Sequence, residues 1–214
     1  CAVTPLVAAE RAHLAGAGKG GVYGEEKTVV VLFIDLRGST RLAEGRLPFD
    51  VVFILNQFFS AMTEAVERHG GHYSNFTGDG LMALYGLDGD LRAGAQGALE
   101  SAYAMLDALN RLNARMRNEL DQPLEIGIGI HAGAAIVGEM GPPKHPVLTA
   151  LGDPVNTAAR LESLTKEAGA PILLSADAAA LGEIDAAGFA ARETQVKGRA
   201  EPVRFHLVSE PTGL

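Results

Sequence analysis

The sequence has little cysteine, little lysine and no long apolar run, and each shortage excludes a class of protein. Cys1 is the only cysteine, so there is no intramolecular disulfide, no cysteine zinc site and no cysteine nucleophile. A chain of this kind suits a reducing compartment. No apolar run reaches about 18 residues and no signal peptide is visible, so we expect no membrane span. Any function that needs an ammonium group must use one of the five lysines, Lys19, Lys27, Lys144, Lys166 and Lys197.

Basic charge is also scarce, because 18 Lys and Arg stand against 26 Asp and Glu. The net charge of −8 provides no basic footprint for duplex nucleic acid, and we expect no nucleic-acid partner. The 214 residues are 47% hydrophobic and 21% charged, which is typical of one α/β domain with a short appendage. Because the chain begins with Cys rather than Met, we expect a fragment of a longer protein that has an upstream sensor or membrane domain. We expect the fragment to be cytoplasmic.

The chain divides into a first segment over residues 1–27, a folded domain over residues 28–208 and a C-terminal tail over residues 209–214. Residues 5–18 have the composition of a short helix that the following glycines would end. The first segment is either a linker that transmits a signal from an upstream module or a frayed terminus, and the sequence leaves both open.

The folded domain shows alternating strand and helix patterns. The sequence predicts, in order, a buried strand (28–36), a helix (48–70), two short strands with a turn (72–86), a helix (90–120), a hairpin (124–141), a loop (142–146), a helix (152–169), a strand (171–175), a short helix (176–182) and a closing hairpin (187–208). This order predicts an α+β fold with a ferredoxin-like βαββαβ core and a C-terminal αβαββ extension.

Two aspartates occupy comparable places in this pattern. Asp35 lies at the end of the first buried strand, and Asp79 lies in the glycine turn of the next strand pair. In a βαββ unit the first and third strands are neighbours, so the two carboxylates can meet at one edge. Like charges this close raise one pKa unless a cation intervenes. A divalent ion with oxygen ligands, Mg²⁺ or Mn²⁺, explains the pair, although an Asp in a glycine turn is more often structural.

Small residues follow the first aspartate in the stretch 36-LRGST-40. At a strand-to-helix junction such residues expose backbone N–H groups, which favour phosphate oxygens. Together with a metal pair, this is the usual equipment for phosphoryl or nucleotidyl transfer.

Asn156 and Arg160 are four residues apart on one predicted helix and share a face. In isolation this is best explained as a solvated helix face with an Arg–Glu pair. The functional alternative sets an amide against a ribose and a guanidinium against a developing phosphate charge.

Three blocks, 33-FIDLRGST-40, 76-FTGDGLMALYG-86 and 151-LGDPVNTAARLE-162, resemble the catalytic core of the class III nucleotidyl cyclases, and 128-IGIHAG-133 also fits. The resemblance covers residues 28–208 and identifies them as a catalytic domain of the bacterial type. It implies that a nucleoside triphosphate is converted into a 3′,5′-cyclic monophosphate and pyrophosphate.

The resemblance also implies residue roles. Asp35 and Asp79 match the two metal-binding aspartates, with Ile34 as a further metal-binding position, and two Mg²⁺ or Mn²⁺ ions are expected per site. Asn156 matches the amide that orients the ribose, and Arg160 matches the arginine that stabilises the transition state. The remaining substrate-binding positions are Leu36, Arg37, Gly38, Ser39, Thr40, Asn75, Thr149, Lys197 and Arg199.

Family sites form between two catalytic domains, one of which contributes the aspartates and the other the asparagine and arginine. This chain holds both sets, so the resemblance implies a head-to-tail homodimer with an inactive monomer.

Base selection departs from the family. Members specific for ATP commonly have lysine where this chain has Asn75, and many bacterial members share Thr149 in place of an aspartate. Guanylyl cyclases typically use glutamate and cysteine at these two positions, so we favour an ATP-specific adenylate cyclase in signal transduction. The alternatives are a guanylate cyclase, an inactive nucleotide-binding regulatory domain and, last, a diguanylate cyclase. Thr149 also raises the hypothesis of a response to bicarbonate.

The phosphate contacts depart as well. Some relatives carry an arginine at the position of Gly127, which leaves more of the phosphate binding to the metals, Lys197 and Arg199. We interpret His131 in the same strand as a packed structural residue.

Overall fold

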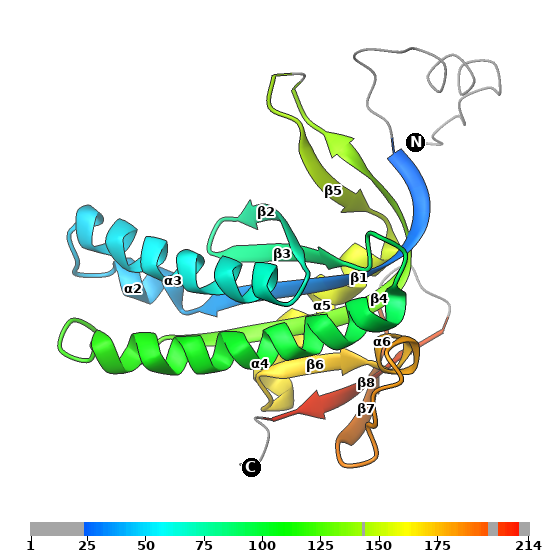
Figure 1. The fold of residues 1–214 in the computed structure, drawn as a ribbon. Coiled ribbons are helices and arrows are strands. Elements are labelled where there is room, and N and C mark those ends of the chain that lie inside the picture. The colour runs from blue at the N-terminus through cyan, green and yellow to red at the C-terminus, as the bar shows by residue number, and fades with distance from the viewer. Residues whose placement is uncertain (1–23, 143, 197–200, 210–214) are drawn as a thin grey trace, which may run out of the picture.

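The computed structural model describes residues 24–142, 144–196 and 201–209, without the side chains of residues 40, 41 and 75–77. These residues form a mixed sheet with helices on both faces (Figure 1). The elements are β1 (Gly24–Arg37), α2 (Ser39–Ala43), α3 (Pro48–Arg68), β2 (His72–Thr77), β3 (Gly80–Tyr85), α4 (Leu91–Arg115), β4 (Glu125–Met140), β5 (Val147–Leu151), α5 (Asp153–Ala168), β6 (Ile172–Ser175), α6 (Ala176–Leu181), β7 (Ala190–Thr194) and β8 (Val203–Val208).

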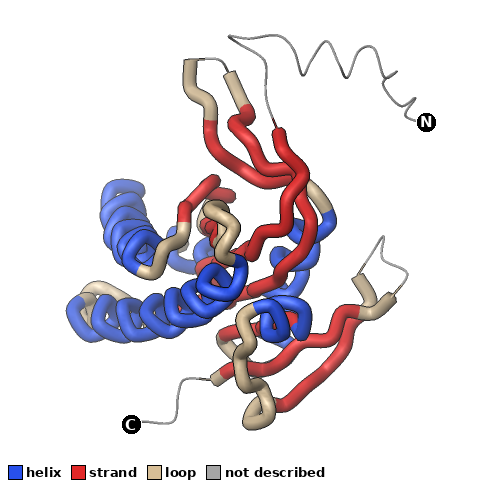
Figure 2. Tube along the Cα trace, turned by 45° about the vertical axis from the view of Figure 1, so that its right-hand side comes forward, coloured by secondary structure: helices blue, strands red, loops and turns tan. Residues whose placement is uncertain are grey.

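The strand order confirms the predicted ferredoxin-like core and its extension. The sheet runs β2-β3-β1-β4-β6-β8-β7, and β5 pairs with β4 outside this path. Helices α3 and α4 pack together on one face of the sheet, and α5 packs against β1 and β4 on the other (Figures 1 and 2). The β4–β5 hairpin extends beyond the rest of the sheet as an arm (Figure 1).

Local sequence signals explain where the long helices begin and end. Pro48 occupies the first helical position of α3, where a missing N–H costs nothing. The side chain of Asp90 caps α4 by accepting a hydrogen bond from the Ala93 N–H. Gly169 adopts the left-handed conformation that closes α5. All three helices lie where the sequence predicts them, although α4 ends five residues earlier than the predicted limit at residue 120.

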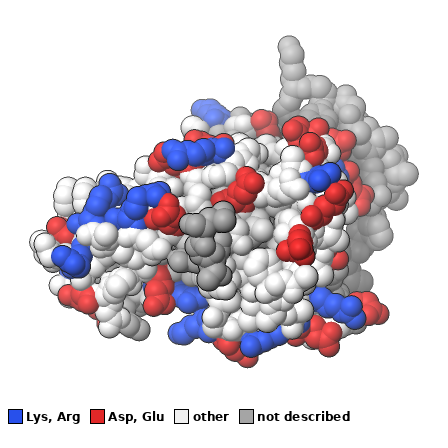
Figure 3. Space-filling view, turned by 60° about the horizontal axis from the view of Figure 1, so that its bottom comes forward, with Lys and Arg blue, Asp and Glu red and all other residues white. Residues whose placement is uncertain are grey.

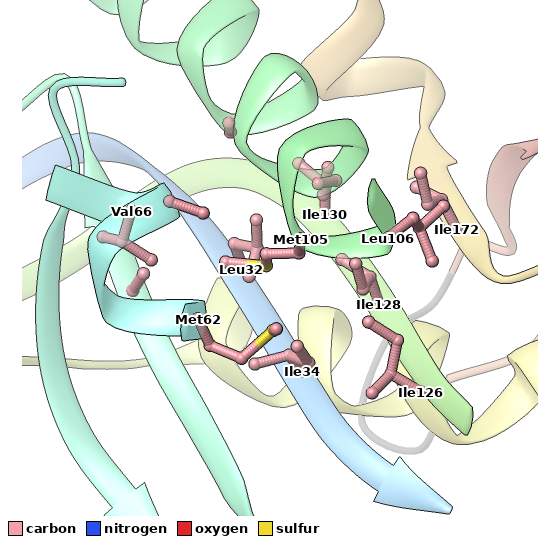
Figure 4. Packing of buried hydrophobic residues seen from close by; sticks show 14 of the residues in the cluster. Leu32, Ile34, Met62, Val66, Met105, Leu106, Ile126, Ile128, Ile130 and Ile172 are labelled. Carbon is pink, nitrogen blue, oxygen red and sulfur yellow. The ribbon is translucent and has the colours of Figure 1, made fainter. Parts of the chain in front are cut away.

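The core confirms that the first strand is buried on both faces. One face of β1 carries Leu32 and Ile34, which pack with Met62 of α3 and Met105 of α4 (Figure 4). The other face carries Val31, which packs with residues of β3, β4 and α5. On the α5 side, Asp35 and Arg37 interrupt this apolar pattern at the C-terminal end of the strand.

The predicted hairpin over residues 124–141 is wrong, because β4 is one continuous strand of 16 residues. Its glycines mark close helix packing instead of a turn. A Cβ on Gly129 would lie 2.2 Å from the carbonyl oxygen of Ala158, and one on Gly133 would lie 2.8 Å from Pro154 Cγ. The turn comes later, in the loop 141–146 that joins β4 to β5.

Helix α3 is the one element of the described residues that is long and apolar enough to cross a membrane by length and composition. We expected no such segment from the sequence. The buried side chains of Ile54, Phe58 and Met62 place one face of α3 in the domain core. Phe49 and Phe53, near its start, remain 81% and 54% exposed.

Candidate active site

The structure brings Asp35 and Asp79 together, as the topology predicts. Asp35 of β1 pairs with Gly80 of β3, and Asp79 directly precedes that glycine in the β2–β3 turn. The two carboxyl groups lie within hydrogen-bonding distance. Burial, followed by the charge of Asp79, raises the pKa of Asp35 from 3.8 to about 6. No basic side chain among the described residues offsets this repulsion at Asp35.

Asp79 is fixed by the segment that follows Asp35. The Ser39 hydroxyl donates a hydrogen bond to the Asp79 carboxylate, and the Leu36 N–H donates to the Asp79 carbonyl at 3.4 Å. Between them, Gly38 has a φ of +70°, which allows the chain to turn from β1 into α2. Helix α2 is not predicted from the sequence, because its five residues are too few for a periodic pattern.

These hydrogen bonds limit which groups of residues 36–40, the predicted phosphate-binding segment, can bind phosphate. The side chain of Leu36 is buried in the core and its N–H is already engaged by Asp79. The Ile34 side chain is also buried, so Ile34 could reach a metal only through its backbone. Gly38 is exposed and Ser39 is partly buried, whereas the side chain of Thr40 lies outside what the structure describes.

A third carboxylate, Glu162 of α5, lies beside this pair and was missed by the sequence analysis. Burial, followed by the charge of Asp35, raises the pKa of Glu162 from 4.5 to about 7. The helix approaches β4 closely because Gly127 and Gly129 carry no side chain. A signal for Glu162 was present in the sequence. Glu162 lies one helical turn after the buried Ala158, so it shares the face of α5 that packs on the glycine-rich strand β4.

Arg37 supplies the basic charge next to Glu162. Its guanidinium lies 3.7 Å from the Glu125 carboxylate, and its charge opposes the rise in the pKa of Glu162. The Nε and Nη2 atoms of Arg37 are buried without a hydrogen-bond partner among the described residues. The structure therefore holds an arginine with unused donors at the end of β1, two residues from Asp35.

Asn156 and Arg160 share an exposed face of α5, as predicted. The buried face of this helix carries Pro154, Ala158 and Leu161, so the two polar side chains lie on its outer side. Within the described part of the chain, Arg160 makes no ion pair and does not act on Asp35 or Glu162. Within one copy of the chain, the Asn156–Arg160 pair therefore does not interact with the Asp35–Asp79 pair.

The two predicted base-selecting positions lie on strands that contact each other. The Ser74 hydroxyl of β2 donates a hydrogen bond to the Leu148 carbonyl of β5 at 2.7 Å. Asn75 and Thr149 are the residues that follow these two partners. Thr149 is 7% exposed, and the side chain of Asn75 is not described.

The last predicted substrate-binding residues, Lys197 and Arg199, lie outside the described residues. His131 is 1% exposed, with its Nδ1 atom 3.8 Å from Asp177, which confirms that it is a packed residue. Figure 3 shows acidic and basic side chains interspersed over one face, without a continuous basic area among the described residues drawn there.

The chain is similar to proteins of one family. The profile of the adenylate and guanylate cyclase catalytic domain matches residues 22–209. The chain therefore belongs to the adenylate and guanylate cyclase catalytic domain family.

Solved structures of cyclases share the fold, and two of them represent the group. The guanylyl cyclase Cya2 superposes with a TM-score of 0.78 at 31% identity, over 89% of this chain and 96% of that one. The adenylyl cyclase CyaB from P. aeruginosa superposes with a TM-score of 0.76 at 29% identity, over 89% of this chain and 98% of that one. These two structures thus represent both base specificities.

A curated relative comes from Mycobacterium tuberculosis. The uncharacterized protein Rv1318c is 38% identical over 193 residues, which are 89% of this chain and 34% of that protein. The chain therefore spans about a third of the length of the curated relatives that it matches.

Proposed function

We propose that this chain is the catalytic domain of an adenylate cyclase, which converts ATP into 3′,5′-cyclic AMP and pyrophosphate at sites shared by two copies of the chain. The observation that carries the proposal is the separation of two half-sites. One copy presents the adjacent carboxyl groups of Asp35 and Asp79, and Asn156 and Arg160 lie on the outer face of α5. A second copy in head-to-tail orientation would bring its Asn–Arg pair to the acidic pair of the first.

The acidic pair suits two Mg²⁺ or Mn²⁺ ions. The carboxyl groups are adjacent and partly buried, and no described cation offsets their repulsion. Carboxylate oxygens are the ligands that these hard cations prefer, and Mg²⁺ usually combines one or two carboxylates with substrate phosphates and water. This agrees with the described residues, which contain no group of three or more His, Cys, Asp or Glu placed to hold a metal alone. When bound, such ions would neutralise phosphate charge and lower the pKa of the ribose 3′-hydroxyl.

The side chains of the second half-site would orient the substrate and stabilise charge. Asn156 would hold the ribose so that its 3′-hydroxyl faces the α-phosphate. Arg160 would place its guanidinium on the charge that grows there, a contribution of about 2.7–4 kcal/mol for one well-placed donor. Lys197 and Arg199 would contact the triphosphate, as would the segment from Gly38 to Thr40. No side-chain nucleophile is needed, because the attacking group belongs to the substrate.

Exposed apolar side chains on the β4–β5 arm support the proposal that two copies of the chain form a dimer. Ile136 of β4 and Val147 and Leu151 of β5 are 42%, 38% and 57% exposed. They lie on the hairpin that extends beyond the sheet (Figure 1). Apolar surface of this kind is commonly covered by a partner, and the head-to-tail dimer gives it one.

The choice of ATP rests on Asn75 and Thr149. Guanylyl cyclases of this family typically carry glutamate and cysteine at these positions, and this chain has neither. The hydrogen bond between Ser74 and Leu148 supports a common role, since it holds the strands of both residues together. GTP is the second candidate, because the similar structure Cya2 is that of a guanylyl cyclase.

Product identification tests the proposal. Purified chain with Mn²⁺ and an equimolar mixture of ATP and GTP should yield cyclic AMP as the main product. A main yield of cyclic GMP would replace adenylate with guanylate cyclase, and the absence of any cyclic nucleotide from a dimeric, metal-bound sample would reject cyclase activity. We further propose a cytoplasmic location and an upstream sensor or membrane domain in the full-length protein.

A further inference from the structure

The position of Glu162 relative to the acidic pair is set by strand register. Gly127 of β4 pairs directly with Asp35 of β1, so substituents at both positions point to the same face of the sheet. A Cβ on Gly127 would lie 2.6 Å from Glu162 Oε1. The Thr165 hydroxyl, at 2.3 Å, and the Glu162 carboxylate therefore share the space of the missing side chain at position 127. Opposed Cβ positions are about 4.5–5.5 Å apart, which places Glu162 beside Asp35.

The packing of α5 holds Glu162 in this place. A Cβ on Gly129 would lie 2.3 Å from the Glu162 backbone nitrogen, so the helix backbone itself rests on the glycine strand. Thr165 donates a hydrogen bond to the Glu162 carbonyl at 2.6 Å, which tightens the helix at this turn. The packing of α5 on β4 and the Thr165 hydrogen bond therefore fix the position of Glu162 in the helix. A carboxylate on a flexible surface segment would lack both constraints.

The Glu162 carboxylate has acceptor capacity to spare. Its Oε2 atom accepts one long hydrogen bond of 3.4 Å from Ser163, and its Oε1 atom accepts none from the described residues. The basic charge that acts on it comes from Arg37, and the acidic charges come from Asp35 and Asp79. A partly buried carboxylate with a free oxygen is costly unless a donor or a cation uses it.

Glu162 does not complete a direct metal site with the two aspartates. The described residues contain no group of three acidic, histidine or cysteine side chains placed around one ion. A carboxylate next to the metal ligands can act through a bound water, and such outer partners orient the ligands and raise the affinity of the site.

We propose that Glu162 is a positioning residue of the metal centre, which supports a cation on Asp35 and Asp79 through a bound water. This inference rests on the proposed function, because it assumes that the aspartates bind divalent metal. Loss of an outer carboxylate typically lowers metal affinity by about 10–100-fold, and we expect about 10-fold for Glu162→Gln.

The test measures Mn²⁺ binding to the nucleotide-free protein by the electron paramagnetic resonance signal of free Mn²⁺. Glu162→Gln should raise the dissociation constant about 10-fold. Glu167→Gln removes an exposed carboxylate from the same helix and should bind as the parent does. Glu162→Asp keeps the charge but shortens the reach by one methylene, so it should bind as weakly as Glu162→Gln.

The outcomes separate this inference from the proposed function. If Asp35→Asn abolishes binding and Glu162→Gln binds as the parent does, the metal centre stands and the role of Glu162 is wrong. If Glu162→Asp binds as the parent does, charge alone suffices and the positioning role is wrong. If the parent and Asp35→Asn bind Mn²⁺ equally, the metal centre fails and the inference fails with it. Thermal melts of the metal-free variants show whether each one is folded.

Discussion

Helix α5 packs on β4 with its backbone directly against Gly129, and Gly129→Ala tests this contact. The new Cβ would lie 2.2 Å from the Ala158 carbonyl oxygen, 2.3 Å from the Glu162 nitrogen and 3.0 Å from the Glu162 Cα. All three are backbone atoms of α5, so no side-chain rotation relieves the clash. The helix must move outward by about 1 Å before the contacts become attractive.

This displacement has a predictable cost. Overpacking a well-packed core costs about 1–3 kcal/mol, and a strand glycine replaced by alanine recovers about 0.4–1 kcal/mol from the unfolded state. Because the clash is with backbone, we expect a net loss of about 2 kcal/mol. With a urea slope of about 2.5 kcal/mol/M, the unfolding midpoint falls by about 0.8 M. The same shift moves Asn156 and Arg160, and a 1 Å misplacement can cost about 100-fold in rate.

Urea unfolding followed by circular dichroism measures the stability change, with cyclic nucleotide production as the second readout. Gly188→Ala is the control, because a Cβ there meets nothing within 4 Å and the residue is exposed. It should leave both quantities unchanged. If Gly129→Ala unfolds at the same urea concentration as the parent, the close packing of α5 on β4 does not exist in solution.

Three further predictions concern the acidic cluster, the core and the β2–β5 contact. The pKa values of Asp35 and Glu162 are raised to about 6 and about 7. The folded state therefore binds protons more tightly than the unfolded state. Metal-free protein should lose stability as the pH rises from about 5 to about 7.5. Saturating Mn²⁺ or Glu162→Gln should flatten that fall in a melting series, and a stability that rises over this range would contradict it. Phe58→Ala removes a fully buried ring and should cost about 3–5 kcal/mol in urea unfolding, whereas a loss under about 1 kcal/mol would show that Phe58 is not in the core. Ser74→Ala removes the hydrogen bond to Leu148 and should cost about 1 kcal/mol and change the ratio of cyclic AMP to cyclic GMP; an unchanged product ratio would separate this contact from base selection.

The sequence was sufficient for the parts of the fold that have strong periodic patterns. The apolar run of β1, the long helices and the order of elements predicted the sheet neighbours β1 and β3, and with them the meeting of Asp35 and Asp79. Asn156 and Arg160 share a face because helical spacing fixes it. Strand order and helical spacing predicted where these residues lie, whereas their roles in a shared site came from the resemblance to the family.

The parts that the sequence did not reveal depend on contacts between distant segments. The glycines of β4 suggested a turn, but Gly129 leaves room for the backbone of α5 and Gly127 leaves room for the side chains of Thr165 and Glu162. Glu162 is a polar residue at the edge of an apolar face, and only the register of β1 on β4 shows that it lies beside Asp35. Helix α2 is too short to give a pattern, although its first residue holds Asp79.

The central claim is that a complete site combines the acidic pair of one copy with the Asn–Arg pair of another. Mixing two inactive variants tests it most directly. Asp79→Ala and Arg160→Ala should each lack activity while remaining dimeric, and heterodimers of the two should regain one intact site and up to half of the parent activity per dimer. Heterodimers that form and stay inactive would contradict the shared site.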